Sequence, residues 1–429
     1  MNKQRKKYNF TYTANFSSKI IRPKNLKELK SYLTKDFTIV GNLRSYGDTF
    51  IGTGKHISLS NFNKILNLNL KKKIIEIESG ASLAKMNEEI FKKGLILKCM
   101  PGCKYVSIGG MISNNISGKL LFQNNLKNFI ISIKLINNKN QIVECSRNKN
   151  KKLFNLSIGG KGRTGPIISA KLKLEKLNSS EISQELFMFN SYKNFYYLIS
   201  NLIKFQYAVC WIDFTKKNFD GIIFAGSHKN NKNIINNNYS DFKISNLFVI
   251  LLSFFVKKKL ITQIFNFFFK LKNKTMPKNI LSLNNFFFPQ NKILNWNEFF
   301  KKEGFIQFQI YFKINNLENI IDTIKKEIYI YKIFSNFAII KFHSKNKNKF
   351  EKLSLSLDFP VKDNFVLIKR FINKLVSKYD LEVELSKDIA LYSLNPKTLK
   401  NNEVFMQQNI KYINKNFKSR IFKRLNRNE

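Results

Sequence analysis

The spacing of apolar residues predicts a mixture of helices and strands in the first third of the chain. Residues 18–34 begin with an entry strand and continue as a helix, because Leu26, Leu29 and Leu33 recur at three- and four-residue intervals. Residues 37–42 form a short apolar run that ends at a glycine. The pattern therefore predicts a strand that delivers the chain directly into a glycine-bearing loop.

A second unit of strand, turn and helix follows. Residues 74–78 alternate isoleucine with glutamate, which is typical of a half-buried strand. Leu83, Met86 and Ile90 then lie on one face of a predicted helix, and Gly94 is suited to end it.

Two further strand patterns precede residue 178. Residues 129–146 predict a hairpin, because two alternating apolar runs flank the polar turn 137–140. After a third glycine-bearing loop, Ala170, Leu172 and Leu174 alternate with lysines and predict another strand.

Later in the chain, two stretches alternate strictly. In 304–314 the apolar residues form one face, while Gln307, Gln309 and Lys313 project from the other. Residues 352–360 repeat the pattern with serines and an aspartate on the polar face. Such a face is suited to cover a polar heterocycle or a sugar, or it simply meets water at the surface of an antiparallel sheet.

A short apolar run at 245–256 is followed by lysines and then by the aromatic-rich stretch 261–273. The run is well short of the roughly 20 residues that span a bilayer. Lysines between apolar clusters are typical of an interfacial segment or of a lid over an apolar channel, and a buried core helix is the alternative.

The charge of the chain is extreme, at +47 with a pI near 10.0 over 429 residues. It indicates either attraction to anionic lipid, phosphate-bearing substrate or nucleic acid, or compositional drift, since Lys, Asn, Ile and Phe are abundant together. The lysines are dispersed, and no helix-turn-helix, zinc-finger or RNP motif is visible. We favour drift, with peripheral membrane contact as a by-product, and expect no specific nucleic-acid partner.

Four cysteines and three histidines show no metal-ligand spacing, so we expect no metal site. The basic N-terminus lacks the apolar core of a signal peptide. We expect a cytoplasmic protein, at the inner face of the membrane if its charge attracts lipid.

Three glycine-bearing loops share the first third of the chain, at 41–48, 101–119 and 157–167. Adjacent glycines let a backbone approach a ligand closely and expose peptide N–H groups to phosphate oxygens. The third loop lacks the Gly-Lys-Ser/Thr order of a P-loop, and the glycine spacing does not match a Rossmann fingerprint. Together the loops predict one extended cofactor across one domain.

The motifs RSYGD at 44–48, PG…V-x-I-GG-x-I…GK at 101–119 and IGG-x-G-x-TG-x-I at 158–167 resemble the FAD-binding fold of the vanillyl-alcohol oxidase/p-cresol methylhydroxylase (PCMH) type. Within that superfamily the chain is most similar to the decaprenylphosphoryl-β-D-ribose 2′-oxidase family. The resemblance is strong over 41–175 and returns at 304–313, 353–361 and 384–388.

This resemblance implies an α+β fold, with a two-subdomain FAD-binding PCMH-type domain over 1–178. A substrate or cap domain with an antiparallel sheet would cover 179–380, and residues 381–429 would return to the FAD domain.

The resemblance also implies residue roles. Lys387 would be the cation beside flavin and substrate, Gln307 and Gln309 the amides at their contact, and Tyr46 part of the same pocket. Lys341, Ser356 and Gln309 would lie on the substrate side. The predicted FAD-binding residues are Arg44, Ser45, Tyr46, Gly47, Asp48, Pro101, Gly102, Gly109, Gly110, Asn114, Ser117, Gly118, Lys119, Gly162, Thr164, Gly165, Ile167 and Lys387.

Two departures from the family pattern concern the cofactor. Ser117 stands where relatives have a histidine that can tether flavin, so we predict non-covalent FAD. Leu43 stands where the family usually has a second glycine.

The implied reaction is oxidation of a secondary alcohol of a polyprenyl-phosphate-linked ribose at C2′, with hydride transfer to flavin N5. A short-chain reductase partner would then complete an epimerisation. The alternatives are an aldonolactone or alditol oxidase with a soluble substrate, and a basic binding protein without flavin.

Overall fold

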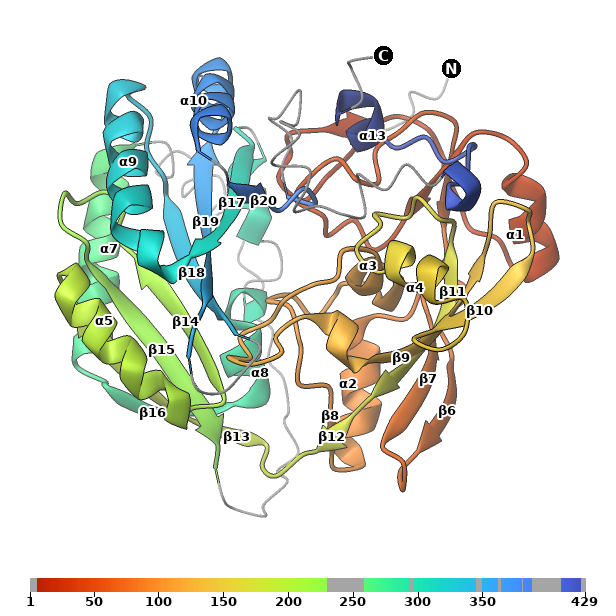
Figure 1. The fold of residues 1–429 in the computed structure, drawn as a ribbon, viewed down its shortest axis with the longest axis horizontal. Helices are drawn as coiled ribbons and strands as arrows, with labels where there is room; N and C mark the ends of the chain where they lie inside the picture. Colours follow the sequence, from red (N-terminus) through yellow and green to blue (C-terminus); the bar gives the residue numbers. More distant parts are fainter. Residues whose placement is uncertain are drawn as a thin grey trace.

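The computed structural model describes residues 6–229, 258–292, 296–301, 303–344, 349–361, 364–379, 381–387 and 410–425. The apolar run at 245–256 lies outside them. Figure 1 shows two lobes side by side, the N-terminal lobe (residues 6–178) on the right and the C-terminal lobe (residues 179–387) on the left. Both lobes mix helices with sheets, so the fold is α+β, as the sequence predicted.

The elements of the N-terminal lobe are β1 (Lys7–Tyr8), β2 (Asn15–Phe16), β3 (Ile20–Ile21), α1 (Leu26–Tyr32), β4 (Phe37–Val40), β5 (Lys55–Ser58), β6 (Ile65–Asn69), β7 (Ile74–Glu78), α2 (Leu83–Lys92), β8 (Leu95–Ile96), α3 (Ile108–Ser113), β9 (Ile130–Ile136), β10 (Ile142–Ser146), α4 (Lys151–Ser157), β11 (Ile167–Lys173) and β12 (Glu175–Lys176). Those of the C-terminal lobe are β13 (Glu181–Phe189), α5 (Tyr192–Ser200), β14 (Tyr207–Ile212), β15 (Gly221–His228), α7 (Lys259–Lys274), β16 (Lys278–Ser282), α8 (Leu283–Phe287), β17 (Phe305–Lys313), α9 (Leu317–Ile330), β18 (Phe337–His343), β19 (Lys352–Pro360), α10 (Phe365–Lys378) and β20 (Glu382–Val383). Helix α13 (Arg420–Leu425) follows near the C-terminus.

Two sheets form most of the N-terminal lobe. Strands β3, β5 and β4 make a parallel sheet, and β10, β9, β11, β7 and β6 make an antiparallel one. Helix α2 begins at Ser82, whose side chain accepts a hydrogen bond from the Lys85 N–H. It ends just before Gly94, which has the left-handed φ of +65°. The strands and the helix predicted here from periodicity are confirmed.

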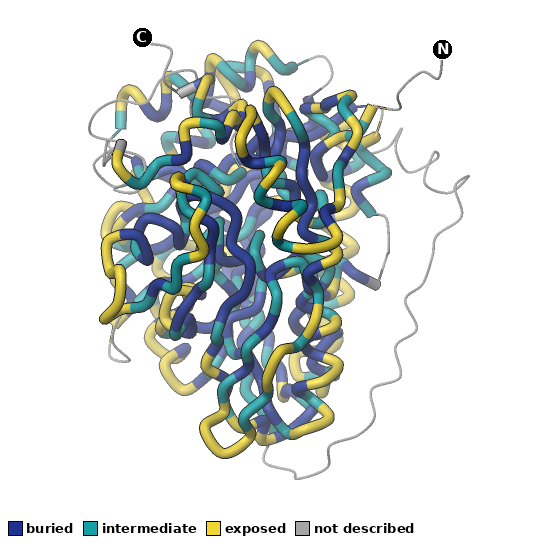
Figure 2. Tube along the Cα trace, turned by 90° about the vertical axis from the view of Figure 1, so that its right-hand side faces the viewer, coloured by how far each residue is buried: buried dark blue, intermediate teal, exposed yellow. Residues whose placement is uncertain are grey.

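The C-terminal lobe is built on one antiparallel sheet in the order β16-β13-β15-β14-β18-β19-β17-β20. Helices α5, α9 and α10 cover one face, where Phe195, Ile324 and Phe371 join Phe308 of β17 in a buried cluster. Figure 2 shows buried segments through the middle of the molecule and exposed ones at its outer turns. Since β20 pairs with β17, the sheet continues past residue 380, where we had placed a boundary.

None of the helices in the described part of the chain combines the length and the apolar character needed to cross a bilayer.

Residues 410–425 lie against the N-terminal lobe. Phe417 forms a β-bridge with Phe37, and Ser419 forms another with Gly52. The Arg424 guanidinium donates to both oxygens of Asp48, at 3.1 Å each, and both side chains are buried. This bidentate pair attaches α13 to the loop that follows β4.

We predict that Arg424→Leu lowers the free energy of unfolding by about 3–5 kcal/mol, because it leaves the buried Asp48 carboxylate without its closest cation. Arg420→Leu is the matched control, since Arg420 lies 3.9 Å from the same carboxylate but its side chain is 57% exposed. Its effect should stay within about 1 kcal/mol. Urea and thermal unfolding measure both, and equal losses in the two variants would contradict this role.

Candidate active site

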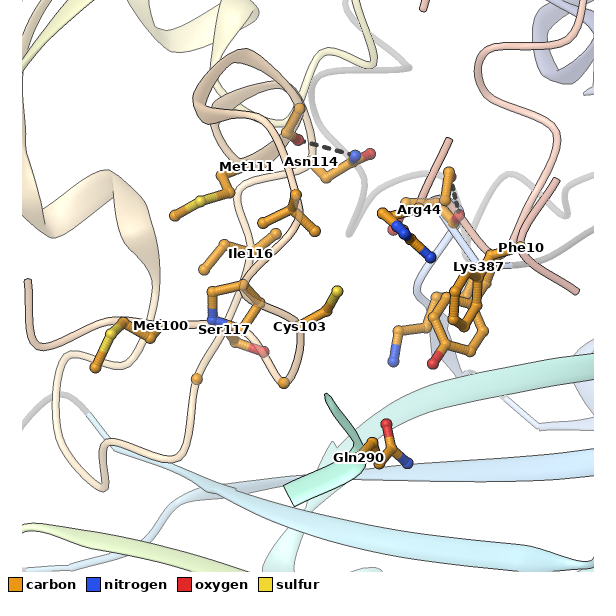
Figure 3. A pocket seen from close by; sticks show the side chains of 18 of the residues that line it. Phe10, Arg44, Met100, Cys103, Met111, Asn114, Ile116, Ser117, Gln290 and Lys387 are labelled. Atoms are coloured by element: carbon orange, nitrogen blue, oxygen red, sulfur yellow. Dashed lines mark hydrogen bonds between the residues drawn. The ribbon is translucent and has the colours of Figure 1, made fainter. Parts of the chain in front are cut away.

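A cavity of about 950 Å³ is lined by residues of both lobes. Figure 3 shows part of its wall, with Met111, Asn114 and Ser117 on one side and Arg44 and Lys387 on the other. All three glycine-bearing loops reach this cavity.

The first loop follows β4 directly. The strand ends at the buried Val40, and the loop begins at the next residue. Asn9 and Thr11 hold the loop from outside by donating to the Tyr46 carbonyl, at 2.7 and 2.9 Å. Leu43 has a φ of +56°, in the left-handed region that favours glycine. Leu43 thus adopts a backbone conformation typical of glycine, at the position where the resemblance implied a glycine.

The second loop leads into α3. The Ser107 side chain accepts from the Gly110 N–H at 3.3 Å, and the Gly109 N–H donates to the Ser79 carbonyl at 2.8 Å. A Cβ at Gly118 would lie 2.5 Å from the Met100 carbonyl oxygen, so only glycine fits there without a shift of the backbone. These contacts bring the peptide backbone to the cavity wall.

The third loop connects α4 to β11. Gly162 and Gly165 have φ values of +85° and +119°, which only glycine adopts readily. A Cβ at Gly165 would also come within 1.9 Å of the Ile136 carbonyl oxygen. Lys161 and Gly162 of this loop line the cavity.

The opposite wall comes from the polar face of the C-terminal sheet. The Gln307 amide donates to Asp358 at 2.6 Å, and Gln309 accepts from Ser356 at 2.9 Å. Both glutamines are buried, so the alternative that this face meets bulk water is wrong. Burial raises the pKa of Asp358 to about 7, although the Gln307 hydrogen bond and Lys387 favour its ionised form.

Three lysines face one another across the cavity. Lys341 donates to the Ser117 carbonyl at 3.1 Å, and Lys119 donates to the Phe286 carbonyl. Burial and the charge of Lys341 lower the pKa values of both Lys119 and Lys387 to about 7. Lys387 also lies over the Tyr46 ring, 5.7 Å from its centroid.

Glu384 and Tyr311 are site residues that the sequence reasoning missed. The Tyr311 hydroxyl donates to Glu384 at 3.0 Å, and Lys161 pairs with the same carboxylate at 3.3 Å. Burial opposes ionisation of Glu384, but Lys161, Ser386 and Lys387 together lower its pKa to about 2. Tyr311 could have been found, because it continues the alternation of Gln307 and Gln309 along β17.

The structure brings most of the predicted residues to the cavity. The residues that line it are Arg44, Ser45, Tyr46, Pro101, Gly102, Gly109, Gly110, Asn114, Ser117, Gly118, Lys119, Gly162, Gly165, Ile167, Gln307, Gln309, Lys341, Ser356 and Lys387. Gly47, Asp48 and Thr164 are not among the lining residues. Gly47 donates its N–H to the Ser386 carbonyl, Asp48 pairs with Arg424, and the Thr164 hydroxyl is bonded to Ser157.

The residues of the cavity fit FAD. The volume of the cavity lies at the upper end of the range of roughly 300–1,000 Å³ that small-molecule and cofactor sites occupy. Four buried polar atoms of its lining residues have no hydrogen-bond partner among the described residues: Arg44 Nε, Ser79 Oγ, Asn114 Oδ1 and Gln307 Oε1. The three loops would hold the diphosphate and adenosine, and the polar face of β17 would lie against the flavin ring.

The comparisons with known proteins agree with this fit. Residues 19–146 match the sequence model of the FAD binding domain. The chain is similar to the D-lactate dehydrogenase of Anaerostipes hadrus, at 29% identity over 32% of this chain and 30% of that protein. It is similar to the L-gulonolactone oxidase of Bos taurus, at 24% identity over 35% of this chain and 36% of that protein. The decaprenylphosphoryl-beta-D-ribose oxidase of Mycolicibacterium smegmatis is 27% identical over 30% of this chain and 29% of that protein.

The chain thus spans about a third of the length of each of these relatives. The matches support a relationship to the FAD-binding, PCMH-type oxidoreductases. They do not favour the decaprenylphosphoryl-ribose enzyme over the other relatives. FAD is the cofactor of this chain.

The lowered lysine pKa values predict that FAD binding takes up protons. At a pH of about 8, Lys119 and Lys387 are mostly neutral, and the negative diphosphate would raise their pKa values. Calorimetric titration of flavin-free protein with FAD in Tris and in Hepes should give different heats. Both Lys119→Met and Lys387→Met should reduce the difference. Equal heats for the unaltered protein in the two buffers would contradict the prediction.

Proposed function

We propose that the chain is an FAD-dependent oxidoreductase that oxidises a CH–OH group of a sugar. The observation that supports it best is the cavity itself, because residues of the three glycine-bearing loops line it together with the Gln307, Gln309 and Lys387 side chains. The match of residues 19–146 to the FAD binding domain supplies the cofactor.

Each side chain of the C-terminal wall has a task that follows from its contacts. When bound, FAD supplies the acceptor for the hydride of the alcohol. Asp358 fixes the Gln307 amide so that its oxygen remains for a ligand. Ser356 fixes the Gln309 amide by donating to its oxygen. Lys387, which we expect to be protonated once FAD is bound, can stabilise the negative charge that develops as the alcohol is oxidised.

Charge and apolar lining favour a substrate of a particular kind, a polyprenyl-phosphate-linked ribose oxidised at C2′. Among the described residues that line the cavity, Arg44 and five lysines are opposed by the single carboxylate of Glu384. This excess is suited to a phosphate in addition to the cofactor. Trp211, Phe224 and Phe269 line another part of the cavity and are suited to an apolar chain.

A soluble aldonolactone or alditol is the second candidate within the same reaction class. The observation in its favour is the similarity to the L-gulonolactone oxidases of Bos taurus and Mus musculus, each 24% identical over about a third of this chain.

The experiment that tests the function is anaerobic titration of the purified flavoprotein with candidate donors while the visible spectrum is recorded. We expect polyprenyl-phosphoryl ribose to bleach the oxidised-flavin bands. Bleaching by an aldonolactone or an alditol alone would favour the second candidate. A flavin that no sugar alcohol reduces would contradict the proposal.

We further predict that Lys387→Met retains FAD but slows flavin reduction by about 10²–10³-fold, the usual cost of losing one electrostatic contact in an active site. Lys313→Met is the matched control, because Lys313 ends β17 with its side chain exposed and outside the cavity. Reduction of the Lys387→Met protein at the unaltered rate would show that Lys387 does not stabilise this charge.

A further inference from the structure

Helix α7 is attached to the C-terminal lobe by its polar side. Its buried residues are Thr262 and Asn266. The Asn266 amide donates to Asp213 at 2.7 Å, the Thr262 hydroxyl bonds to Asn336 at 3.2 Å, and one turn further on Lys270 pairs with Asp220. The side of the helix that carries residues 262, 266 and 270 thus faces the protein.

The opposite side of α7 is apolar and exposed. It consists of Leu260, Ile264, Phe267, Phe268 and Leu271, each between 47% and 66% exposed. A helix on a globular domain normally buries its apolar stripe and exposes its polar one. The orientation of α7 is the reverse, so the buried core helix that we considered from the sequence is wrong for residues 259–274.

Just beyond the helix, the apolar Met276 side chain is also exposed, at 55%. Contiguous apolar surface of this kind marks a contact site. Figure 1 places α7 on the left of the C-terminal lobe.

Charge identifies the kind of surface that the stripe would meet. Residues 258–282 include six lysines and no aspartate or glutamate. Lys258 and Lys259 are exposed at one end of the helix, and Lys272, Lys274 and Lys278 at the other. Exposed aromatic residues between lysines are typical of helices that lie in the interface of an anionic membrane.

The same helix reaches the cavity. Phe269 packs on Trp211 with ring centroids 5.0 Å apart, and both line the cavity together with Lys272 and Met276. The helix that carries the exposed stripe therefore also supplies part of the cavity wall.

We propose that α7 forms a docking face for an anionic lipid bilayer. The outward apolar side chains enter the headgroup region and the flanking lysines meet lipid phosphates. Resting on the proposed function, this face brings the cavity to a membrane surface, from which an amphiphilic substrate would be taken.

The test is flotation of the full-length flavoprotein with vesicles of phosphatidylcholine and phosphatidylglycerol, and with vesicles of phosphatidylcholine alone. The protein should float with the anionic vesicles and less so at high salt. The double variant F267Q/F268Q, whose two residues do not line the cavity, should bind at least about tenfold more weakly. The matched control is Y329Q/I330Q, an adjacent exposed pair on α9, which should float like the unaltered protein.

The thermal midpoint and the mass in solution identify any other occupant. If the stripe is a docking face, the F267Q/F268Q variant has the same thermal midpoint and the same mass in solution as the unaltered protein. A lower midpoint would mean that another segment of the chain covers the stripe, and a change from dimer to monomer would mean that a second copy does; either overturns the proposal. It is also overturned if the unaltered protein does not float, or if F267Q/F268Q floats equally well.

These outcomes are independent of turnover. Loss of flotation with normal flavin reduction by a sugar alcohol would overturn the docking face alone. Normal flotation without reduction by any sugar alcohol would overturn the proposed function alone.

Discussion

The accumulation of buried positive charge around one cavity is the constraint on which the arrangement of both lobes depends. Lys119 donates to the Phe286 carbonyl in the C-terminal lobe, and Lys341 donates to the Ser117 carbonyl in the second glycine-bearing loop. Lys161 pairs with the Glu384 carboxylate. A cation removed from water is costly unless it is paired, and here the pairing atoms lie on segments far apart in the sequence. Burial and mutual repulsion lower the pKa values of Lys119 and Lys387 to about 7, so an anionic ligand stabilises the site by restoring their charge. The diphosphate of FAD is such a ligand.

The same contacts explain how the lobes are joined. After Gly118 the chain crosses to the C-terminal lobe, where Leu120 forms a β-bridge with Tyr207 and the Asn124 amide donates to the Phe342 carbonyl at 2.8 Å. The loop that lines the cavity at Gly118 and Lys119 therefore also contacts β14 and β18, and β18 carries Lys341. Short connections of this kind join the two lobes.

Much of this was predictable from the sequence where local pattern decides the outcome. The strands at 74–78, 130–136 and 305–313 follow from alternation, and the glycine-bearing loops follow from composition and from resemblance. Helices α5, α9 and α10 were not predicted, because the resemblance implied an antiparallel sheet over 179–380 and the apolar periodicity of these three segments was not used. Glu384 was missed because its role depends on Lys161 and Tyr311, which meet it only in the folded chain. The reversed orientation of α7 was likewise invisible, since periodicity shows that a helix has an apolar side but not which side meets the protein.

We predict that the two lobes together hold FAD without a covalent bond. The most direct measurement is the visible spectrum of the purified protein, followed by acid precipitation and separation of the pellet from the supernatant. We predict an oxidised-flavin spectrum with one FAD per chain, and FAD in the supernatant after precipitation. A folded protein that contains no flavin and binds none when FAD is added would contradict the account and favour a basic binding protein. Flavin that remains in the pellet would show that the cofactor is tethered despite Ser117.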